Sequence, residues 1–262
     1  MLELTAYGAR RRVKGAIALA VAISLFSLLY VGFFPSLASN VDLQQYVDSL
    51  PSVFVEAFGL RAFGTIEGYL ATELYHFAWV ILFGVYLAYS AAGLLASDVE
   101  SGRIDVLLSL PVPRRRLVAE KYLALAPGIL LVNVVVGAVT WAGTRVIGFP
   151  VAISDVIAVH ALSLPYLFTC AGIGLACSVV ASRASIAQRA AMGLTFGLFL
   201  VESLVTGTDY AWAGAIAPSR YYDPTAILVD GQYDLAGAAI LTAAAVLLVA
   251  ASGYYFARRD VN

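Results

Sequence analysis

The sequence predicts an all-α integral membrane protein with six transmembrane helices, and three observations support this prediction. Of the 262 residues, 61% are hydrophobic and 13% are charged, whereas a soluble domain has about 45–50% and about 25%. Six segments are apolar over the roughly 20 residues that a helix needs to cross a bilayer. The Lys and Arg residues are also concentrated in every second one of the segments that flank and join these spans. We therefore expect one transmembrane domain that covers residues 1–262.

The six expected spans follow one another without an internal repeat. The first could instead be a signal peptide, because it follows a basic stretch, but its length favours a retained anchor. The third span carries Pro127 and Gly128 and the fourth carries Pro165, where kinks are expected. The spans cover residues 15–34, 72–96, 117–144, 156–180, 188–206 and 236–257.

The positive charges predict the orientation of the chain. If both termini are cytoplasmic, thirteen of the sixteen Lys and Arg residues lie on the inner side, and only Arg61, Arg145 and Arg220 lie outside. Inner loops carry such an excess of positive charge in membrane proteins. Tyr75 and Trp79 are expected to mark the outer end of the second span, because aromatic side chains favour the boundary between membrane and water. The sequence thus predicts a multi-pass protein of the cell membrane with cytoplasmic N- and C-termini.

Two outer segments, residues 35–71 and 207–235, are long enough to have structure of their own. In the first, apolar residues near helical spacing from Val53 to Phe63 fit a helix on the membrane surface or a loop helix packed on the spans. The second combines prolines, tyrosines and acids. Its composition fits a structured turn or a partly re-entrant segment, which would have to be buried in protein or line water.

The inner segment between the second and third spans, residues 97–122, predicts a small amphipathic helix. Ile104, Leu107 and Leu108 fall at i, i+3 and i+4, so they form an apolar stripe. Pro111 and Pro113 end this helix, because proline cannot continue the hydrogen-bond ladder. The expected result is a rigid knob on the inner membrane face. An interfacial helix whose arginines touch anionic lipid is the alternative.

The same segment resembles the intracellular loop of the permeases of ABC-2 type transporters. In that family the loop reads as an acid, a Gly-Thr-like pair, an apolar block with Ser, a Pro, a basic pair and a Lys. Arg103 and Pro113 depart from the usual residues. The ending "YYFARRDVN" and the element "PSRYYDP" before the last span are also similar to this family, so the resemblance covers the whole chain. The matching loop residues are Glu100, Gly102, Leu107, Leu108, Ser109, Pro111, Arg114, Arg115 and Lys121.

The resemblance implies a fold, partners and a mode of action. It implies an interfacial helix before the first span, a coupling helix between spans two and three, and a second permease chain, identical or related. It implies two copies of a separate ATPase subunit that binds ATP and Mg, and this family is predominantly associated with export. The residues expected at the ATPase are Glu100, Gly102, Arg103, Ile104, Leu107, Leu108, Pro111 and Arg114. Ile104, Leu107 and Leu108 would enter a cleft on the ATPase, with charges at the rim.

The lysines agree with a separate source of energy. The chain has two, Lys14 followed by Gly15 and Lys121 followed by Tyr122. A phosphate-binding P-loop needs Gly-Lys-Ser or Gly-Lys-Thr. We therefore expect no nucleotide site, no catalytic residue, and no cofactor or metal bound by this chain.

Polar residues inside the spans are the candidates for a substrate path, because they are costly in a membrane. Asn133 in the third span and Glu202 near the outer end of the fifth are the two we select. Asn133 could equally bond a neighbouring helix. Glu202 is near enough to the outer end for its carboxylate to reach the interface.

Other protein classes fit the sequence less well. Glu73, His76 and His160 could hold a metal in an intramembrane enzyme, but no second acid or nucleophile accompanies them. A carrier of another type is disfavoured by the lack of a repeat, whereas a membrane scaffold would need only packing and a partner surface. Nucleic acid is not an expected partner, because the net charge is −1 and recognition needs a basic face. Membrane lipid is.

Overall fold

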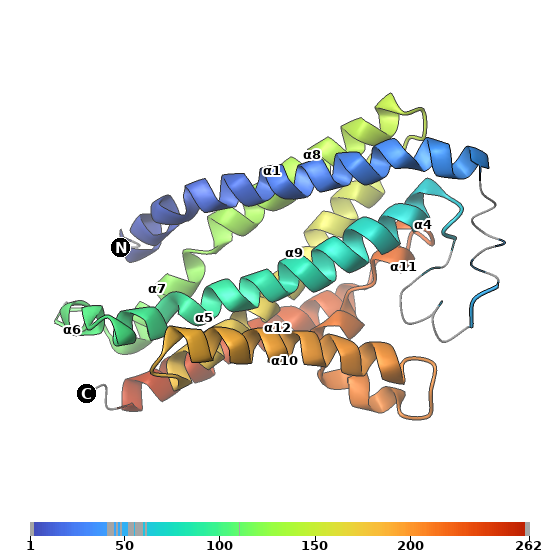
Figure 1. Cartoon of the computed structure of the whole chain (residues 1–262). Helices are drawn as coiled ribbons and strands as arrows, with labels where there is room; N and C mark the ends of the chain where they lie inside the picture. Colours follow the sequence, from blue (N-terminus) through green and yellow to red (C-terminus); the bar gives the residue numbers. More distant parts are fainter. Residues whose placement is uncertain are drawn as a thin grey trace.

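The computed structural model is a bundle of long helices. It describes residues 3–40, 45, 47, 49–51, 55, 60, 62–109 and 111–259, and each regular element among them is helical. Both chain ends and the short helix α6 lie at the same end of the bundle (Figure 1). Six helices in the described part are long and apolar enough to cross a membrane, and each overlaps one expected span. They cover residues 4–39, 66–100, 114–146, 153–180, 184–205 and 235–258.

The first span is part of α1 (Glu3–Asn40), which packs along α8 (Ala126–Val146) (Figure 1). The hydroxyls of Ser27 and Thr140 share a hydrogen bond of 2.7 Å between these helices. The expected interfacial helix is not a separate element, because residues 3–14 form the first turns of α1. No proline lies between them and the span, so nothing in the local sequence breaks the helix.

The second span combines α4 (Ile66–Leu70), the π-helix η1 (Ala71–Phe83) and α5 (Gly84–Glu100) in one continuous rod. Tyr75 and Trp79 face the interior of the bundle, with exposed fractions of 1% and 0%. The expectation that they mark the boundary between membrane and water is therefore wrong. Their rings pack edge-on against His160 in place of lipid head groups.

The third span is interrupted where the sequence predicted. It consists of α7 (Arg114–Leu123) and α8, which are separated by Ala124 and Leu125. Pro127 lies in the first turn of α8, where its missing N–H is tolerated. The fourth span, α9 (Ile153–Val180), instead continues as one helix through Pro165.

Helix α9 is packed against α5 and α12 (Leu235–Arg258). Small residues permit this packing: a Cβ at Gly174 would overlap the backbone carbonyl of Ala88 in α5. The Ser178 hydroxyl accepts hydrogen bonds from the α5 backbone N–H groups of Leu95 and Ala96, at 2.9 and 3.0 Å. The small residues of the fourth span therefore bring two backbones into close contact.

The segment before α12, which was expected on the outer side, follows α10 (Ala184–Val205) and forms a structured turn. It contains the 3₁₀ helices η2 (Ala211–Ile216) and η3 (Pro218–Tyr221) and the short helix α11 (Pro224–Leu228). Within "PSRYYDP", the Asp223 carboxylate accepts from two backbone N–H groups and caps α11. Most of the other outer helix, predicted around residues 53–63, lies outside the described residues.

Candidate functional site

Helix α6 (Arg103–Leu108) is set apart from α5 by Gly102. The φ angle of Gly102 is 67°, a left-handed conformation that glycine adopts without a steric cost. Its backbone N–H donates to the carbonyl of Val99 at 3.1 Å and closes the last turn of α5. The "SGR" of the loop is thus the turn that sends the chain from α5 into α6.

The prolines after α6 define the start of α7. The Pro113 carbonyl accepts hydrogen bonds from the N–H groups of Arg116 and Leu117, at 2.9 and 3.0 Å. Pro111 is exposed just before it. Because proline fixes φ and lacks an N–H, the two residues end α6 and allow the chain to restart as α7.

A group of three charged side chains fastens α6 to the bundle. The Asp98 carboxylate accepts from Arg103 Nε at 3.2 Å and pairs with Lys121 Nζ. Lys121 also donates to the Leu94 carbonyl at 3.2 Å. We call Asp98, Arg103 and Lys121 the charge clamp, because it joins α5, α6 and α7 at one point. Asp98 is 8% exposed and the Arg103 side chain is 53% exposed, so water screens the pair with Lys121 less than the pair with Arg103.

Sequence reasoning missed Asp98 as the centre of this arrangement, and gave Lys121 no role. A signal for Asp98 does exist in the sequence. It lies seven and four residues after Ala91 and Leu94, so the three residues share one helix face, which is the buried one. An acid on a buried face needs a cation, and the structure supplies two, Arg103 of α6 and Lys121 of α7.

Glu100 and Arg114, both expected at a partner, make bonds within the chain. The Glu100 carboxylate accepts from the backbone N–H of Ala184 at 3.0 Å, at the first turn of α10. An acid at this end of a helix is favourable, because the N–H groups there lack partners. Arg114 donates to the Arg259 carbonyl at 2.8 Å, and Arg259 donates to the Val179 carbonyl at 2.7 Å. These contacts join the end of α5 and the start of α7 to the ends of α9, α10 and α12.

The exposed side of α6 differs from the side that the sequence indicated. Ile104 is 2% exposed and packs in the core of the bundle, so it cannot enter a cleft on another protein while α6 remains docked. Leu107 and Leu108 are half-buried, and Val106 is 69% exposed. A three-residue stripe does not reveal which side faces the bundle. The apolar residue most open to a partner is Val106, which the stripe omitted.

Asn133 belongs to a hydrogen-bonded cluster buried between the spans. Its side-chain oxygen accepts from Ser163 at 3.0 Å and lies 3.3 Å from His160 Nδ1. The other ring nitrogen of His160 lies 3.1 Å from the Tyr75 hydroxyl. A neutral imidazole with its proton on Nδ1 satisfies both contacts. We call Tyr75, Asn133, His160 and Ser163 the interior cluster, and each member has a partner within it.

Glu202 binds the segment between α10 and α12 to α10. Its carboxylate lies 3.6 Å from Arg220 Nη1 and accepts from the Thr206 hydroxyl at 3.1 Å. Gly214 of η2 lies directly against this carboxylate, where any Cβ would collide with it. The structure therefore places Glu202 and Asn133 in separate sites, and it gives each a set of bonds within the chain.

The residues considered for a metal do not assemble. His160 contacts Tyr75 and Asn133, and His76 Nδ1 lies 3.3 Å from the Ala71 carbonyl of its own helix. In the part of the chain that the structure describes, no three His, Cys, Asp or Glu side chains come together as metal ligands would.

Six apolar helices of spanning length make this chain a multi-pass α-helical membrane protein. The family model described as "ABC-2 family transporter protein" matches residues 9–261. The chain therefore belongs to the ABC-2 transporter family and is a permease of that type. Neither the curated proteins nor the solved structures compared with it include a match.

Proposed function

We propose that this permease is the membrane subunit of an ATP-driven exporter whose energy comes from a separate ATPase subunit. In the proposed assembly two permease chains, identical or related, meet two ATPase chains, and the ATPases bind ATP and Mg. Both chain ends and α6 would face the cytoplasm, because thirteen of the sixteen positive residues lie on that side.

The main support for this proposal is the apolar surface that α6 exposes. Val106 is 69% exposed, and it has the half-buried Leu107 beside it on the same short helix. The Arg103 side chain, 53% exposed, and Asp105 flank this apolar spot with opposite charges. An apolar anchor surrounded by polar groups that exclude water is what a protein interface uses. Leu108 would enlarge this apolar spot as α6 binds the ATPase.

The anchoring of α6 supports a mechanical role. The charge clamp joins it to α5 and α7, and Glu100 joins the same turn to α10. A force on Val106 would therefore reach three spans through bonds of 3.2 Å or less, without first bending a loose loop. Motion of α7 would act on α8 through the break at Ala124, which gives the third span a hinge. The Pro111 and Pro113 segment would hold the knob at a fixed angle.

The outer faces of the bundle support a second permease chain. Helices α1, α10 and α12 are the least buried of the six spans. Leu194, Leu200 and Leu204 of α10 are exposed along one helix. In a bilayer such a face meets lipid or another helix, and a path for cargo would form where two chains meet.

The test is recovery of an ATPase with the purified permease. The chain is tagged, co-expressed with the ATPase of the neighbouring gene, and purified in mild detergent as the parent and as Val106→Asp. Val146→Asp is the matched control, because Val146 is 86% exposed and lies at the end of α8 that is farther from α6. We expect the parent and Val146→Asp to retain the ATPase and Val106→Asp to lose most of it, at unchanged permease yield.

Two outcomes would count against the proposal. If no ATPase accompanies the parent, the protein would have to be considered again as a carrier of another type, a membrane scaffold or an intramembrane enzyme. If Val106→Asp retains as much ATPase as the parent, the partner does not contact the exposed side of α6.

A further inference from the structure

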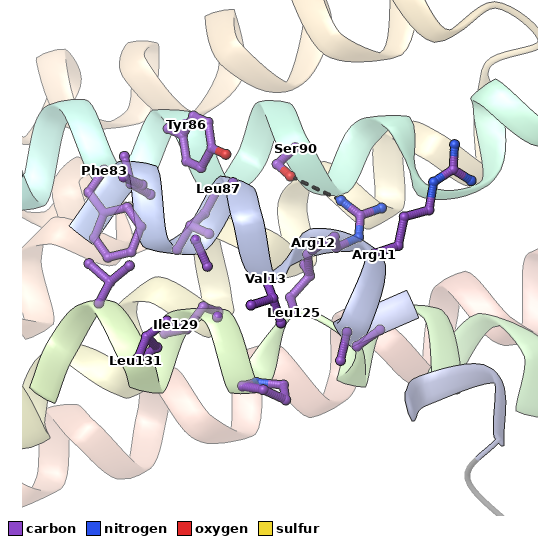
Figure 2. A pocket seen from close by; sticks show the side chains of 18 residues that line it. Arg11, Arg12, Val13, Phe83, Tyr86, Leu87, Ser90, Leu125, Ile129 and Leu131 are labelled. Carbon is purple, nitrogen blue, oxygen red and sulfur yellow. Dashed lines mark hydrogen bonds between the residues drawn. The ribbon is translucent and has the colours of Figure 1, made fainter. Parts of the chain in front are cut away.

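A cavity of about 200 Å³ lies between α1, α5 and α8 near the end of the bundle that carries α6. Figure 2 shows its labelled side chains, with Arg12 crossing from α1 towards Ser90 of α5. The Arg12 guanidinium donates to the Ser90 hydroxyl at 3.5 Å, a weak bond for a group with five N–H donors. None of the ion pairs found among the described residues includes Arg12.

The nearest acid is already engaged. Asp98, on the same face of α5 as Ser90 by helical spacing, is bonded to Arg103 and Lys121 in the charge clamp. Arg11 also lines the cavity and adds a second positive charge. The end of the cavity lined by Arg11, Arg12 and Ser90, which we call the mouth, therefore has an excess of positive charge and more N–H donors than protein acceptors. Its electrostatics favour an anion with several oxygen atoms.

The polarity of the wall changes along α1 and α5, whereas the wall that α8 contributes is apolar throughout. The polar end is lined by Arg12 of α1 and Ser90 of α5. Deeper along the same helices the lining becomes apolar. On α1 the step from Arg12 to Leu19 is seven residues, which is about 10 Å along the axis. The apolar part is lined by Leu19, Phe83, Leu87, Ile129, Leu131 and Val132. A charged mouth above an apolar wall matches the order of head group and tail in a lipid.

We propose that this cavity binds the head group of an anionic phospholipid from the surrounding bilayer. The phosphate accepts from the Arg12 guanidinium and from the hydroxyl of Ser90 or of Tyr86, which also lines the cavity. The start of an acyl chain lies along the apolar wall towards Leu131. Basic pockets between transmembrane helices are a recognised mode of binding for anionic lipids. A free phosphate ion would use the mouth alone and leave the apolar wall exposed to water.

The chain offers two variants that separate this proposal from general attraction of lipid to a basic segment. Arg12→Gln removes the charge that lines the cavity. Arg10→Gln removes an equal charge from the same helix at an exposed residue that does not line it. A third variant, Gly15→Leu, fills the mouth: Gly15 lines the cavity, and a Cβ there would meet nothing within 4 Å.

The experiment is native mass spectrometry of the full chain in detergent, with added dioleoyl phosphatidylglycerol or dioleoyl phosphatidylcholine. We expect the parent to bind the anionic lipid about tenfold more tightly, as one charge-assisted hydrogen bond would allow. Arg12→Gln and Gly15→Leu abolish this preference, and Arg10→Gln changes binding by no more than about threefold. Inorganic phosphate at the same concentration does not compete.

Several results would overturn the proposal. Equal binding of the two lipids by the parent would show that charge does not select the occupant. Equal losses in Arg12→Gln and Arg10→Gln would show attraction to the basic segment in place of a site. Competition by inorganic phosphate would identify an ion site without lipid. If Arg12→Gln does not fold, Gly15→Leu decides, because it leaves every charge in place.

Discussion

Two polar groups of similar size hold this bundle together in opposite ways. The charge clamp at the basic end uses a carboxylate between two cations, and the interior cluster uses an amide, an imidazole and two hydroxyls. The interior cluster is buried throughout, whereas in the clamp Asp98 is buried and the Arg103 side chain is exposed. The difference follows from their surroundings, because a charge deep in a membrane bundle costs far more than one near its end.

The two groups also have different roles. The clamp has an exposed neighbour, α6, on which a partner can act, whereas the interior cluster satisfies its own donors and acceptors. Asn133 is therefore better explained as a fastening between α8 and α9 than as a contact for cargo. Exchanging or disturbing the polar residues of the two groups should therefore have different energetic costs.

The first variant, Asn133→Asp, places a carboxylate in the interior cluster at almost constant volume. We expect the free energy of unfolding to fall by about 3 kcal/mol, the cost of an acid near the centre of a transmembrane helix. Titration with SDS, followed by circular dichroism, measures this change. Unaltered stability would mean that the interior accepts charge, and the contrast between the two groups would fail.

The second variant, Asp98→Asn, is the reverse exchange in the charge clamp. It leaves Arg103 and Lys121 without a carboxylate, and we expect a loss of about 2 kcal/mol. Asp105→Asn is the control, because Asp105 is exposed on α6, and it should change stability by less than about 0.5 kcal/mol. The same SDS titration compares them. Equal effects at the two aspartates would show that burial of Asp98 has no energetic importance.

The third variant, Gly137→Ala, disturbs the interior cluster sterically. A Cβ at Gly137 would lie 2.9 Å from His160 Cδ2, and that ring is bonded on both sides and cannot turn away without losing a contact. We expect a loss of about 1 to 2 kcal/mol from overpacking. Gly32→Ala in α1 meets nothing within 4 Å and should be neutral or slightly stabilising. A larger loss at Gly32 than at Gly137 would contradict the packing described.

The fourth variant, Gly102→Ala, acts on the turn before α6. The residue has φ of 67° and open space around it, so the cost is conformational and should be about 1 kcal/mol. Gly102→Asn should cost less, because asparagine tolerates this conformation. Thermal unfolding in detergent ranks the parent and the two variants. A parental midpoint for Gly102→Ala would show that the turn can rearrange freely.

Features with a strong local cause were predictable from the sequence. The apolar runs predicted six spans, and Pro127 predicted the break between α7 and α8, because each effect acts within a few residues. The helix at 103–108 followed from its spacing and the prolines behind it. Residues 3–14 were expected as a separate helix by resemblance, and they continue into α1 because nothing in the local sequence stops them.

Features that depend on how helices face one another were not predictable. The side of α6 that meets the bundle decides that Ile104 is buried and Val106 exposed, and a short stripe looks the same in either case. Tyr75 looked like a boundary residue, because its partner His160 is 85 residues away and only packing brings the two together. Asp98 was passed over for a similar reason, since its cations come from two other elements.

The most direct test of the central claim, that α6 docks on an ATPase, is a crosslink from its exposed side. Val106→Cys and Val146→Cys are made in a Cys177→Ser background, which leaves only the buried Cys170, and each is labelled with a benzophenone maleimide. After co-expression with the ATPase and irradiation, we predict a crosslinked permease–ATPase band for residue 106 and none for residue 146. Crosslinking of residue 106 to lipid alone, or equal ATPase crosslinking from both positions, would contradict the account.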